Sequence, residues 1–330
     1  MAFGLKYSFK ETILNAEGVI LIAALVGLIF YFAMQNPAFL TVRNFIIILE
    51  TMSILAIASL GICILLIAGE IDISITAIME LAATIAALMS INRYDTGINL
   101  LITFLIILLI GTINGFLTAY IRIPSFIVTL ATKLCITGIV LVLTKYSSLP
   151  IMDKNIIYIF YNAKLFGISI SFYWLLALAI IIAIFLRYFR LGRWIYMTGG
   201  NETYAWALGI PTRKVKFIVF VFSAVLAGIS GLIMGSRSVS ARAFMADGYL
   251  LPAIAAPILG GGSMTGGLGS TIRTLLGALL LTIITNGVYI MGLEPALYNV
   301  FMGITLVIAL SIRASHGKVM LAPWLKIFKK

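Results

Sequence analysis

Long apolar runs, separated by short polar segments, dominate this chain and constrain its fold more than any other feature. Of its 330 residues, 62% are hydrophobic and 10% are charged, whereas a soluble domain carries about 25% charged residues. An apolar helix needs about 20 residues to cross the hydrocarbon of a bilayer. The candidate runs cover residues 18–34, 45–68, 73–91, 97–120, 124–143, 168–186, 217–235, 249–259, 271–291 and 296–312. The sequence therefore predicts an all-α polytopic membrane protein with about ten transmembrane helices.

The eighth run, residues 249–259, is too short to cross a bilayer as a straight helix. It contains Pro252 and Pro257 and leads into the glycine-rich segment 260–269, yet no charged residue lies between Asp247 and Arg273. Irregular backbone at membrane depth is tolerated where protein or a wet cavity surrounds it. We therefore expect a broken eighth helix whose crossing is completed by irregular backbone.

The net charge of +12 resides mainly in the polar segments between the runs. Basic residues in such segments set the orientation of a membrane protein, and no basic stripe with interleaved aromatic residues indicates nucleic-acid binding. With ten crossings and a cytoplasmic N-terminus, fifteen Lys and Arg residues fall in inner segments and seven in outer segments. We therefore expect a multi-pass protein of the plasma (inner) membrane with both termini in the cytoplasm.

A short motif recurs in two runs of opposite direction. Asn114-Gly115 precedes Pro124 at the end of the fourth run, and Asn286-Gly287 precedes Pro295 at the end of the ninth. Related segments of opposite direction are typical of the inverted repeats of transporters. We expect an inverted repeat within one transmembrane domain, with a core at 40–312, a cytoplasmic coupling loop at 188–216 and a basic cytoplasmic tail at 313–330.

The loop at 188–216 contains a short, well-delimited helix. Asn201 is a good N-cap residue and Glu202 follows at the positive end of the helix dipole. Gly209 can adopt the left-handed conformation that ends a helix, and Pro211 prevents its continuation. A helix over 202–208 is too short to be stable alone in water. We interpret it as a docking element for a soluble partner, with Asn201, Glu202, Ala205, Leu208, Gly209 and Ile210 as the coupling residues.

Two carboxylates, Glu70 and Asp72, lie at the turn between the second and third runs. In one interpretation this turn reaches the inner membrane interface and Asp72 caps the third helix. In the other, the carboxylates contact the partner or a basic residue such as Arg193 or Arg273. Both readings place the two side chains at the inner end of the protein.

Three further polar side chains lie within the apolar runs. Glu80 lies two turns into the third run, and we expect it to pair with Lys133 of the fifth or with a hydroxyl, or to contact the solute. Asn114 and Asn286 suit hydrogen bonds between helices or passing contacts with sugar hydroxyls. We regard Glu70, Asp72, Glu80, Asn114 and Asn286 as candidate pathway or inner-turn residues.

No residue set for catalysis or a cofactor is found in the sequence. Cys63 and Cys135 lie in apolar runs and His316, the one histidine, lies in the tail, so a zinc, haem or Ser-His-Asp site is not expected. The glycine-rich segment lacks the lysine of a nucleotide-binding P-loop. We therefore expect neither metal nor cofactor on this chain.

Several motifs in order resemble the permease subunits of ribose-type ATP-binding-cassette (ABC) sugar importers. They are GEIDIS at 69–74, GGNETYAWALGI at 199–210, AIAAPILGGGSMTGG at 253–267, LLGALL at 275–280 and TNG at 285–287. The resemblance covers roughly residues 40–312. The family often has a second glycine at the position of Glu70 and fewer glycines at 260–262, which leaves the solute open among pentoses, hexoses, deoxyhexoses, a furanose signalling molecule and nucleosides.

This resemblance implies a permease that works as a dimer with an identical or related chain. It implies two cytoplasmic ATP-binding cassette subunits, which hydrolyse ATP, and an extracytoplasmic sugar-binding protein. Residues 201–210 would then be the coupling helix, seated in a groove of the cassette. The alternative is a stand-alone ion- or proton-coupled secondary transporter, for which Glu80 and Lys133 are the best support.

Overall fold

The computed structural model describes residues 16–292, 294, 300, 303 and 304 of the chain. Consequently most of the tenth predicted run, the basic tail at 313–330, Pro295 and the N-terminal lysines lie outside the described residues. The helices are α2 (Ala16–Gln35), α3 (Val42–Ile67), α4 (Ile75–Ile91), α5 (Thr96–Ala119), α6 (Ser125–Thr144), α7 (Lys154–Ile157), α8 (Ile170–Tyr188), α9 (Arg190–Gly200), α10 (Glu202–Ala207), α11 (Thr212–Ser238), α12 (Leu250–Leu259) and α13 (Thr271–Ile290). Shorter elements are η1 (Pro37–Leu40), η2 (Tyr158–Asn162), η3 (Asp247–Tyr249), β1 (Leu149–Pro150), β2 (Lys164–Leu165), β3 (Ile168–Ser169) and β4 (Ser240–Ala241).

Seven helices of the described part are long and apolar enough to cross a membrane, and two shorter apolar helices, Ile75–Ile91 and Asp247–Leu259, accompany them. The prediction of a polytopic helical membrane protein is therefore confirmed. Its all-α description needs one small correction, because four two-residue strands form two antiparallel pairs, β1 with β4 and β2 with β3. The eighth predicted run is α12, a helix of 10 residues with Pro257 inside it. The backbone from Gly260 to Ser270 is irregular and joins α12 to α13.

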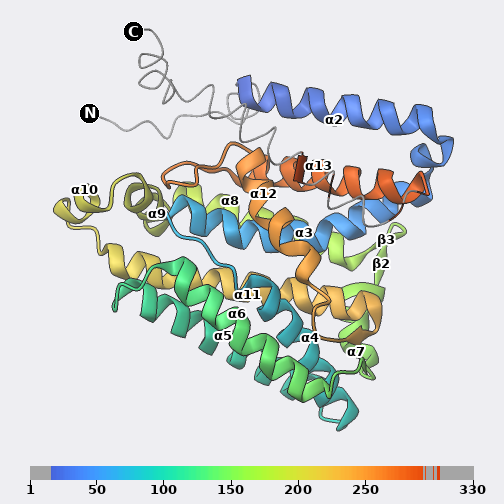
Figure 1. The fold of residues 1–330 in the computed structure, drawn as a ribbon, viewed down its shortest axis with the longest axis horizontal. Helices are drawn as coiled ribbons and strands as arrows, with labels where there is room; N and C mark the ends of the chain where they lie inside the picture. The colour runs from blue at the N-terminus through green and yellow to red at the C-terminus, as the bar shows by residue number, and fades with distance from the viewer. Residues whose placement is uncertain (1–15, 293, 295–299, 301–302, 305–330) are drawn as a thin grey trace, which may run out of the picture.

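The spanning helices fall into a central and a peripheral set. In the apolar windows of α3 and α11, 78% and 72% of the residues are buried, against 22% to 28% in α2, α5, α6 and α8. Figure 1 shows α3 and α11 in the middle, α2 along one flank and α5 and α6 along the other. An exposed apolar helix face requires lipid or another subunit as its environment. The peripheral helices thus provide the faces that a bilayer or a second chain would cover.

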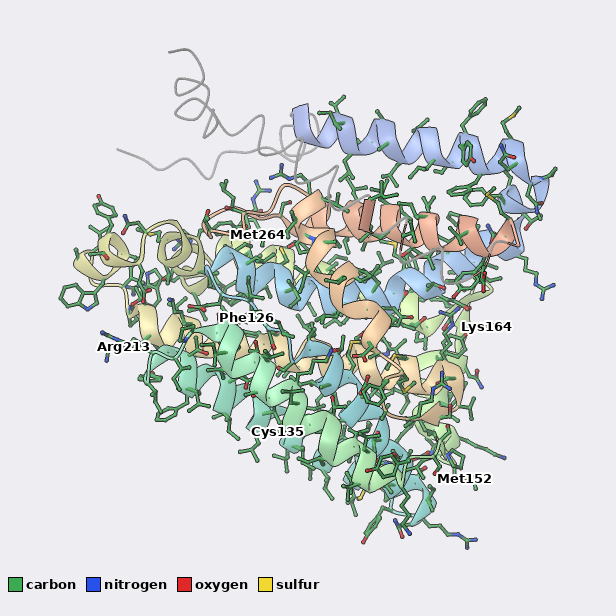
Figure 2. All side chains as sticks on the ribbon, in the orientation of Figure 1. Phe126, Cys135, Met152, Lys164, Arg213 and Met264 are labelled. Carbon is green, nitrogen blue, oxygen red and sulfur yellow. The ribbon has the colours of Figure 1, made fainter. Side chains whose placement is uncertain are left out.

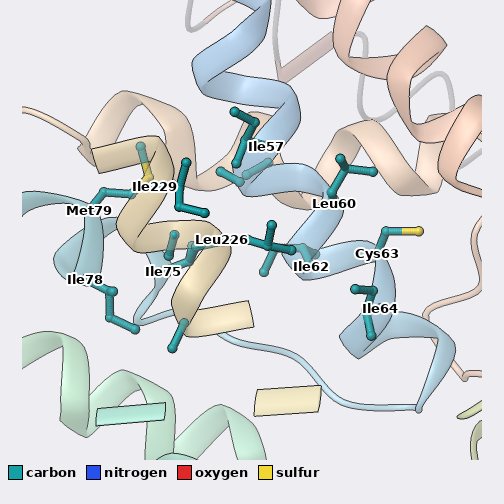
Figure 3. Packing of buried hydrophobic residues seen from close by; sticks show 14 of the residues in the cluster. Ile57, Leu60, Ile62, Cys63, Ile64, Ile75, Ile78, Met79, Leu226 and Ile229 are labelled. Atoms are coloured by element: carbon teal, nitrogen blue, oxygen red, sulfur yellow. The ribbon is translucent and has the colours of Figure 1, made fainter. Parts of the chain in front are cut away.

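The core is built where α3, α4 and α11 cross. Ile57, Leu60 and Ile64 of α3 pack with Ile75 and Ile78 of α4 and with Leu226 and Ile229 of α11 (Figure 3). The helices approach closely because small residues lie at the crossings. A Cβ atom on Gly231 of α11, for example, would overlap the carbonyl group of Met79. Small residues at such contacts are typical of helix packing in membranes, where backbones gain dispersion contacts by close approach.

The two ends of the bundle differ in structure. Helices α9 and α10 lie at one end of the long axis, and α7 with strands β2 and β3 lies at the other (Figure 1). We name these the α10 end and the hairpin end. Arg213 lies at the α10 end and Lys164 at the hairpin end (Figure 2). The α10 end contains most of the predicted coupling residues, and its geometry is described next.

Candidate functional site

Helix α10 begins and ends as its sequence predicts. The side chain of Asn201 accepts a hydrogen bond from the backbone N–H of Tyr204 at 2.9 Å, and Glu202 lies in the first turn. Gly209 has a φ of +78°, in the left-handed region that favours glycine. Pro211 is the N-cap residue of the long helix α11. The capped helix predicted over 202–208 is therefore confirmed, with regular geometry over Glu202–Ala207.

The side chains of α10 divide into a buried anchor and an exposed surface. Ala205 and Ile210 are buried, at 0% and 5% exposure, so they fix the segment against the bundle. Tyr204, Trp206 and Leu208 are 59%, 71% and 53% exposed. Of the predicted coupling residues, Ala205 and Ile210 thus cannot contact a partner in this conformation. Tyr204 and Trp206 were not among the predicted coupling residues, although two aromatic residues in a polar loop are a signal for a docking surface.

Lys216, in the first turns of α11, joins α10 to the turn that carries Glu70. Its Nζ atom lies 2.7 Å from Glu70 Oε1 and 2.7 Å from Glu202 Oε2. Glu70 therefore has a basic partner, as one interpretation of this turn required, but the suggested partners Arg193 and Arg273 were wrong. Arg193 instead donates a hydrogen bond to the carbonyl oxygen of Tyr188. Sequence alone could not select among the many basic residues of this end.

Three glycine-containing segments pack against one another beside α10. A Cβ atom on Gly199 would overlap the carbonyl oxygen of Ile67, and one on Gly266 would overlap that of Gly199. The N–H of Gly267 donates to the Ile67 carbonyl at 2.9 Å. The glycines of segment 260–269 therefore allow close approach of backbone to backbone. The segment between α12 and α13 thus packs against the end of α9 and the end of α3.

Tyr196 adds a side-chain bond to this glycine contact. Its hydroxyl donates to the carbonyl oxygen of Gly269 at 3.0 Å. Burial raises the pKa of the Tyr196 phenol well above its usual range, because the phenolate would lose its hydration. The side chain therefore remains a neutral donor, and α9 stays attached to the glycine-rich segment across the physiological pH range.

Asp72 lies inside the bundle and is 1% exposed. Its Oδ1 atom accepts hydrogen bonds from the backbone N–H and the hydroxyl of Ser74. The prediction that Asp72 is the cap residue of the third predicted helix is therefore wrong. Ser74, not Asp72, is the N-cap residue of α4, and the carboxylate is sequestered from solvent. It instead stabilises the turn that precedes α4.

The segment 70–74 is held in the interior by hydroxyl and amide groups of α5 and α6. The N–H groups of Ile71 and Ile73 donate to Ser125 and Thr129 of α6 at 3.3 and 3.1 Å. Extended backbone in the interior would otherwise leave these donors without partners. The segment is thus fixed to α6 by the two hydroxyls.

Asn114 extends this polar network between helices. Its amide donates to the Ser74 hydroxyl at 3.0 Å and its Oδ1 atom accepts from Thr132 at 2.6 Å. In the second predicted motif, Asn286 of α13 and Asn44 of α3 exchange two amide hydrogen bonds of 2.8 and 3.0 Å. The prediction that both asparagines bond between helices is confirmed. Asn114 is fully buried, so it does not contact a passing solute in this conformation.

Glu80 and Lys133 do not form the predicted ion pair. Lys133 Nζ lies 2.9 Å from Asp247 Oδ1, and Glu80 Oε1 accepts a hydrogen bond from the backbone N–H of Ala246 at 3.1 Å. Both side chains therefore bond the start of η3 instead of one another. The prediction was wrong because it matched the depths of two residues without knowing which polar groups a loop would insert between them.

Within the described part of the chain, no three His, Cys, Asp or Glu side chains gather as a metal site would require. The α10 end does present a surface for contact. Helix α10 has exposed apolar side chains, Lys216 connects it to Glu70 by ion pairs, and the neighbouring end of α9 packs closely against backbone.

Comparison with known proteins agrees with a role in transport. Residues 44–310 match the family described as "Branched-chain amino acid transport system / permease component". The chain is 30% identical to "Probable ABC transporter permease protein y4mJ" of Sinorhizobium fredii, over 94% of this chain and 91% of that one. It is 28% identical to the ribose import permease of Escherichia coli K12, over 94% and 96%. It is also 28% identical to the xylose/arabinose import permease of Sulfolobus acidocaldarius, over 90% and 85%. No solved structure matches the chain.

Proposed function

Because this chain belongs to the permease-component family of the branched-chain amino acid transport system, we propose that it is the membrane permease of an ABC importer for a sugar or sugar-like solute. The relatives named as ribose and xylose/arabinose import permeases support this solute class. The observation that carries the proposal is α10, a capped helix with exposed aromatic side chains at one end of a polytopic bundle. ATP hydrolysis then takes place on separate cassette subunits.

The chain crosses the membrane ten times, with both termini in the cytoplasm. Seven long helices and two shorter ones supply nine crossings, and residues 296–312 supply the tenth. Most of the excess of inner over outer basic residues, which orients the protein, comes from the two termini. Of the fifteen basic residues assigned to the inside, the seven at Lys6, Lys10, Arg313, Lys318, Lys326, Lys329 and Lys330 lie outside the described residues. The α10 end faces the cytoplasm in this topology.

The chain itself consists of two halves of inverted direction. Helix α5 approaches the start of α11 with its last turns, at Gly115 and Phe217, whereas α13 begins beside α9. The two asparagine motifs therefore lie on helices of opposite direction. Each asparagine bonds a polar side chain before or within a neighbouring helix, Ser74 for Asn114 and Asn44 for Asn286. This correspondence supports the inverted repeat.

The pathway keeps the hydroxyl groups of the solute hydrogen-bonded during its passage across the membrane. A solute with many hydroxyls would lose several hydrogen bonds in lipid, each at a cost of several kcal/mol. Two permease chains, whose peripheral helices present apolar faces, enclose a polar route at their shared axis. An extracytoplasmic binding protein delivers the solute to the hairpin end. ATP binding closes the cassette pair, which moves α10 and so favours one of two permease conformations.

Reconstitution tests this function directly. The permease, its cassette subunits and the binding protein are placed in proteoliposomes, and uptake of labelled ribose, xylose and arabinose is measured with ATP supplied at the cassette face. The proposal expects ATP-dependent uptake that a protonophore leaves unchanged. Uptake by the permease alone, without ATP and abolished by the protonophore, would establish the secondary transporter instead.

A further inference from the structure

Lys216 occupies a position that no other basic residue of the described chain shares. It bonds a carboxylate on α10, Glu202, and a carboxylate on the segment between α3 and α4, Glu70, each at 2.7 Å. The helix that carries it, α11, packs along α3, α4 and α5. The ammonium group of Lys216 therefore connects α10 both to α11 and to the segment between α3 and α4.

The two ion pairs differ in their environment. The side chain of Glu70 is 9% exposed and that of Lys216 is 17% exposed, whereas that of Glu202 is 48% exposed. An ion pair shielded from water and salt is stronger and more directional than an exposed one. The ion pair of Lys216 with Glu70 is thus the stronger of the two. The bond to Glu202 is the one that a protein docked on α10 can strengthen by excluding water.

The segment beyond Glu70 leads directly into the interior. Two residues later, Asp72 begins the hydrogen-bonded series that continues through Ser74 to Asn114. Ser74 is the N-cap residue of α4. A displacement of Glu70 would therefore reach the first turn of α4 and the last turns of α5 through buried hydrogen bonds.

From this arrangement we infer that Lys216 is the positioning residue that transmits movement of α10 to segment 70–74 and hence to α4. This inference rests on the proposed function, because it assumes that a cassette moves α10. Lysine suits the role, since its flexible four-carbon stem keeps an ion pair formed while two helices shift relative to each other. The glycine contact of Gly199 with Ile67 does not replace it, because that contact joins α9 to α3 and bypasses α10.

The same turn of α11 offers a matched control. Lys214 lies two residues before Lys216, has the same charge and is exposed to solvent. Lys214→Met removes the same charge from the same end of the protein without breaking the link. Lys216→Arg retains the charge and is the conservative variant.

The experiment measures ATP hydrolysis and solute uptake in the reconstituted complex and reports their ratio. Lys216→Met is expected to assemble with the cassettes and hydrolyse ATP, while uptake per ATP falls about tenfold, within the usual range of coupling between sites. Lys214→Met should leave the ratio unchanged, and Lys216→Arg should restore most of it. The double variant Lys216→Met with Glu70→Gln should lose no more than Lys216→Met alone.

An unchanged ratio in Lys216→Met overturns the inference, as does a double variant whose losses are additive. If Lys216→Met fails to assemble, the exchange Glu70→Lys with Lys216→Glu decides the question. Recovery of uptake per ATP relative to Lys216→Glu supports the link, and no recovery overturns it. Failure of the proposed function is distinguishable, because the wild-type complex would then show no ATP-dependent uptake at all.

Discussion

A methyl group added at Gly199 should destabilise the α10 end, whereas the same change one residue later should not. The Cβ of alanine at 199 would overlap the Ile67 carbonyl oxygen and lie 2.8 Å from the Gly267 nitrogen. At Gly200 no atom lies within 4 Å of the added carbon. Both residues end α9, and neither has a positive φ, so alanine is conformationally tolerated at both.

The size of the effect follows from this geometry. The obstacle at 199 is backbone, which cannot rotate away, and overpacking of this kind costs about 1–3 kcal/mol. Separation of the Gly267 N–H from the Ile67 carbonyl adds about 1 kcal/mol. Within a helix, alanine is more stable than glycine by about 0.5–1 kcal/mol, which offsets part of this cost. The net loss for Gly199→Ala is about 1–3 kcal/mol, and Gly200→Ala is neutral or slightly stabilising.

Labelling of a buried cysteine provides the assay. Cys63 is buried in the bundle and Cys135 is exposed, so a Cys135→Ser background leaves one thiol that reacts with a maleimide dye only after unfolding. The thermal midpoint of labelling in detergent should fall for Gly199→Ala and remain at or above the background value for Gly200→Ala. Equal midpoints for the two variants would refute the close packing assigned to Gly199.

Three further predictions concern other contacts of the structure. Trp206→Ala should weaken binding of the cassette subunit by about 2 kcal/mol, as truncation of a central aromatic contact does, whereas Tyr158→Ala at the hairpin end should not, and a pull-down titration measures both. Asn286→Leu and Asn44→Leu should each lower the thermal midpoint, since each removes both hydrogen bonds between α3 and α13, at about 1 kcal/mol for each bond, and the double variant should lose less than their sum; additive losses would contradict the pairing. Asp72→Ala should reduce uptake and lower the midpoint, because the Ser74 N–H loses its acceptor, and an unaltered protein would contradict the role assigned to this carboxylate.

Features that depend on local sequence were predictable. The N-cap at Asn201 and the left-handed conformation of Gly209 each depend only on residues close in sequence. Helix α10 could therefore be located without the structure. The apolar runs were equally readable, since burial in lipid demands about 20 apolar residues whatever the neighbours. The amphipathic helix α9 was missed because its polar residues look like an ordinary cytoplasmic loop.

Features that depend on distant residues could not be predicted. Glu70 and Lys216 are far apart in the chain, and several basic residues were equally plausible partners by composition. Glu80 and Lys133 were paired by their positions in two apolar runs, but the partner of each side chain also depends on a loop. In the structure Glu80 accepts a hydrogen bond from Ala246, and Lys133 forms an ion pair with Asp247. Spacing gives the depth of a side chain in a bundle, whereas packing decides its partner.

The central claim is that α10 is the surface on which another subunit acts. A photo-crosslinking amino acid placed at Trp206, with the same probe at Tyr158 as the control, tests it in the assembled complex. We expect a crosslink from position 206 to the cassette subunit and none from position 158. A probe at 206 that yields no crosslink to the cassette, or that reacts only with the extracytoplasmic binding protein, would contradict it.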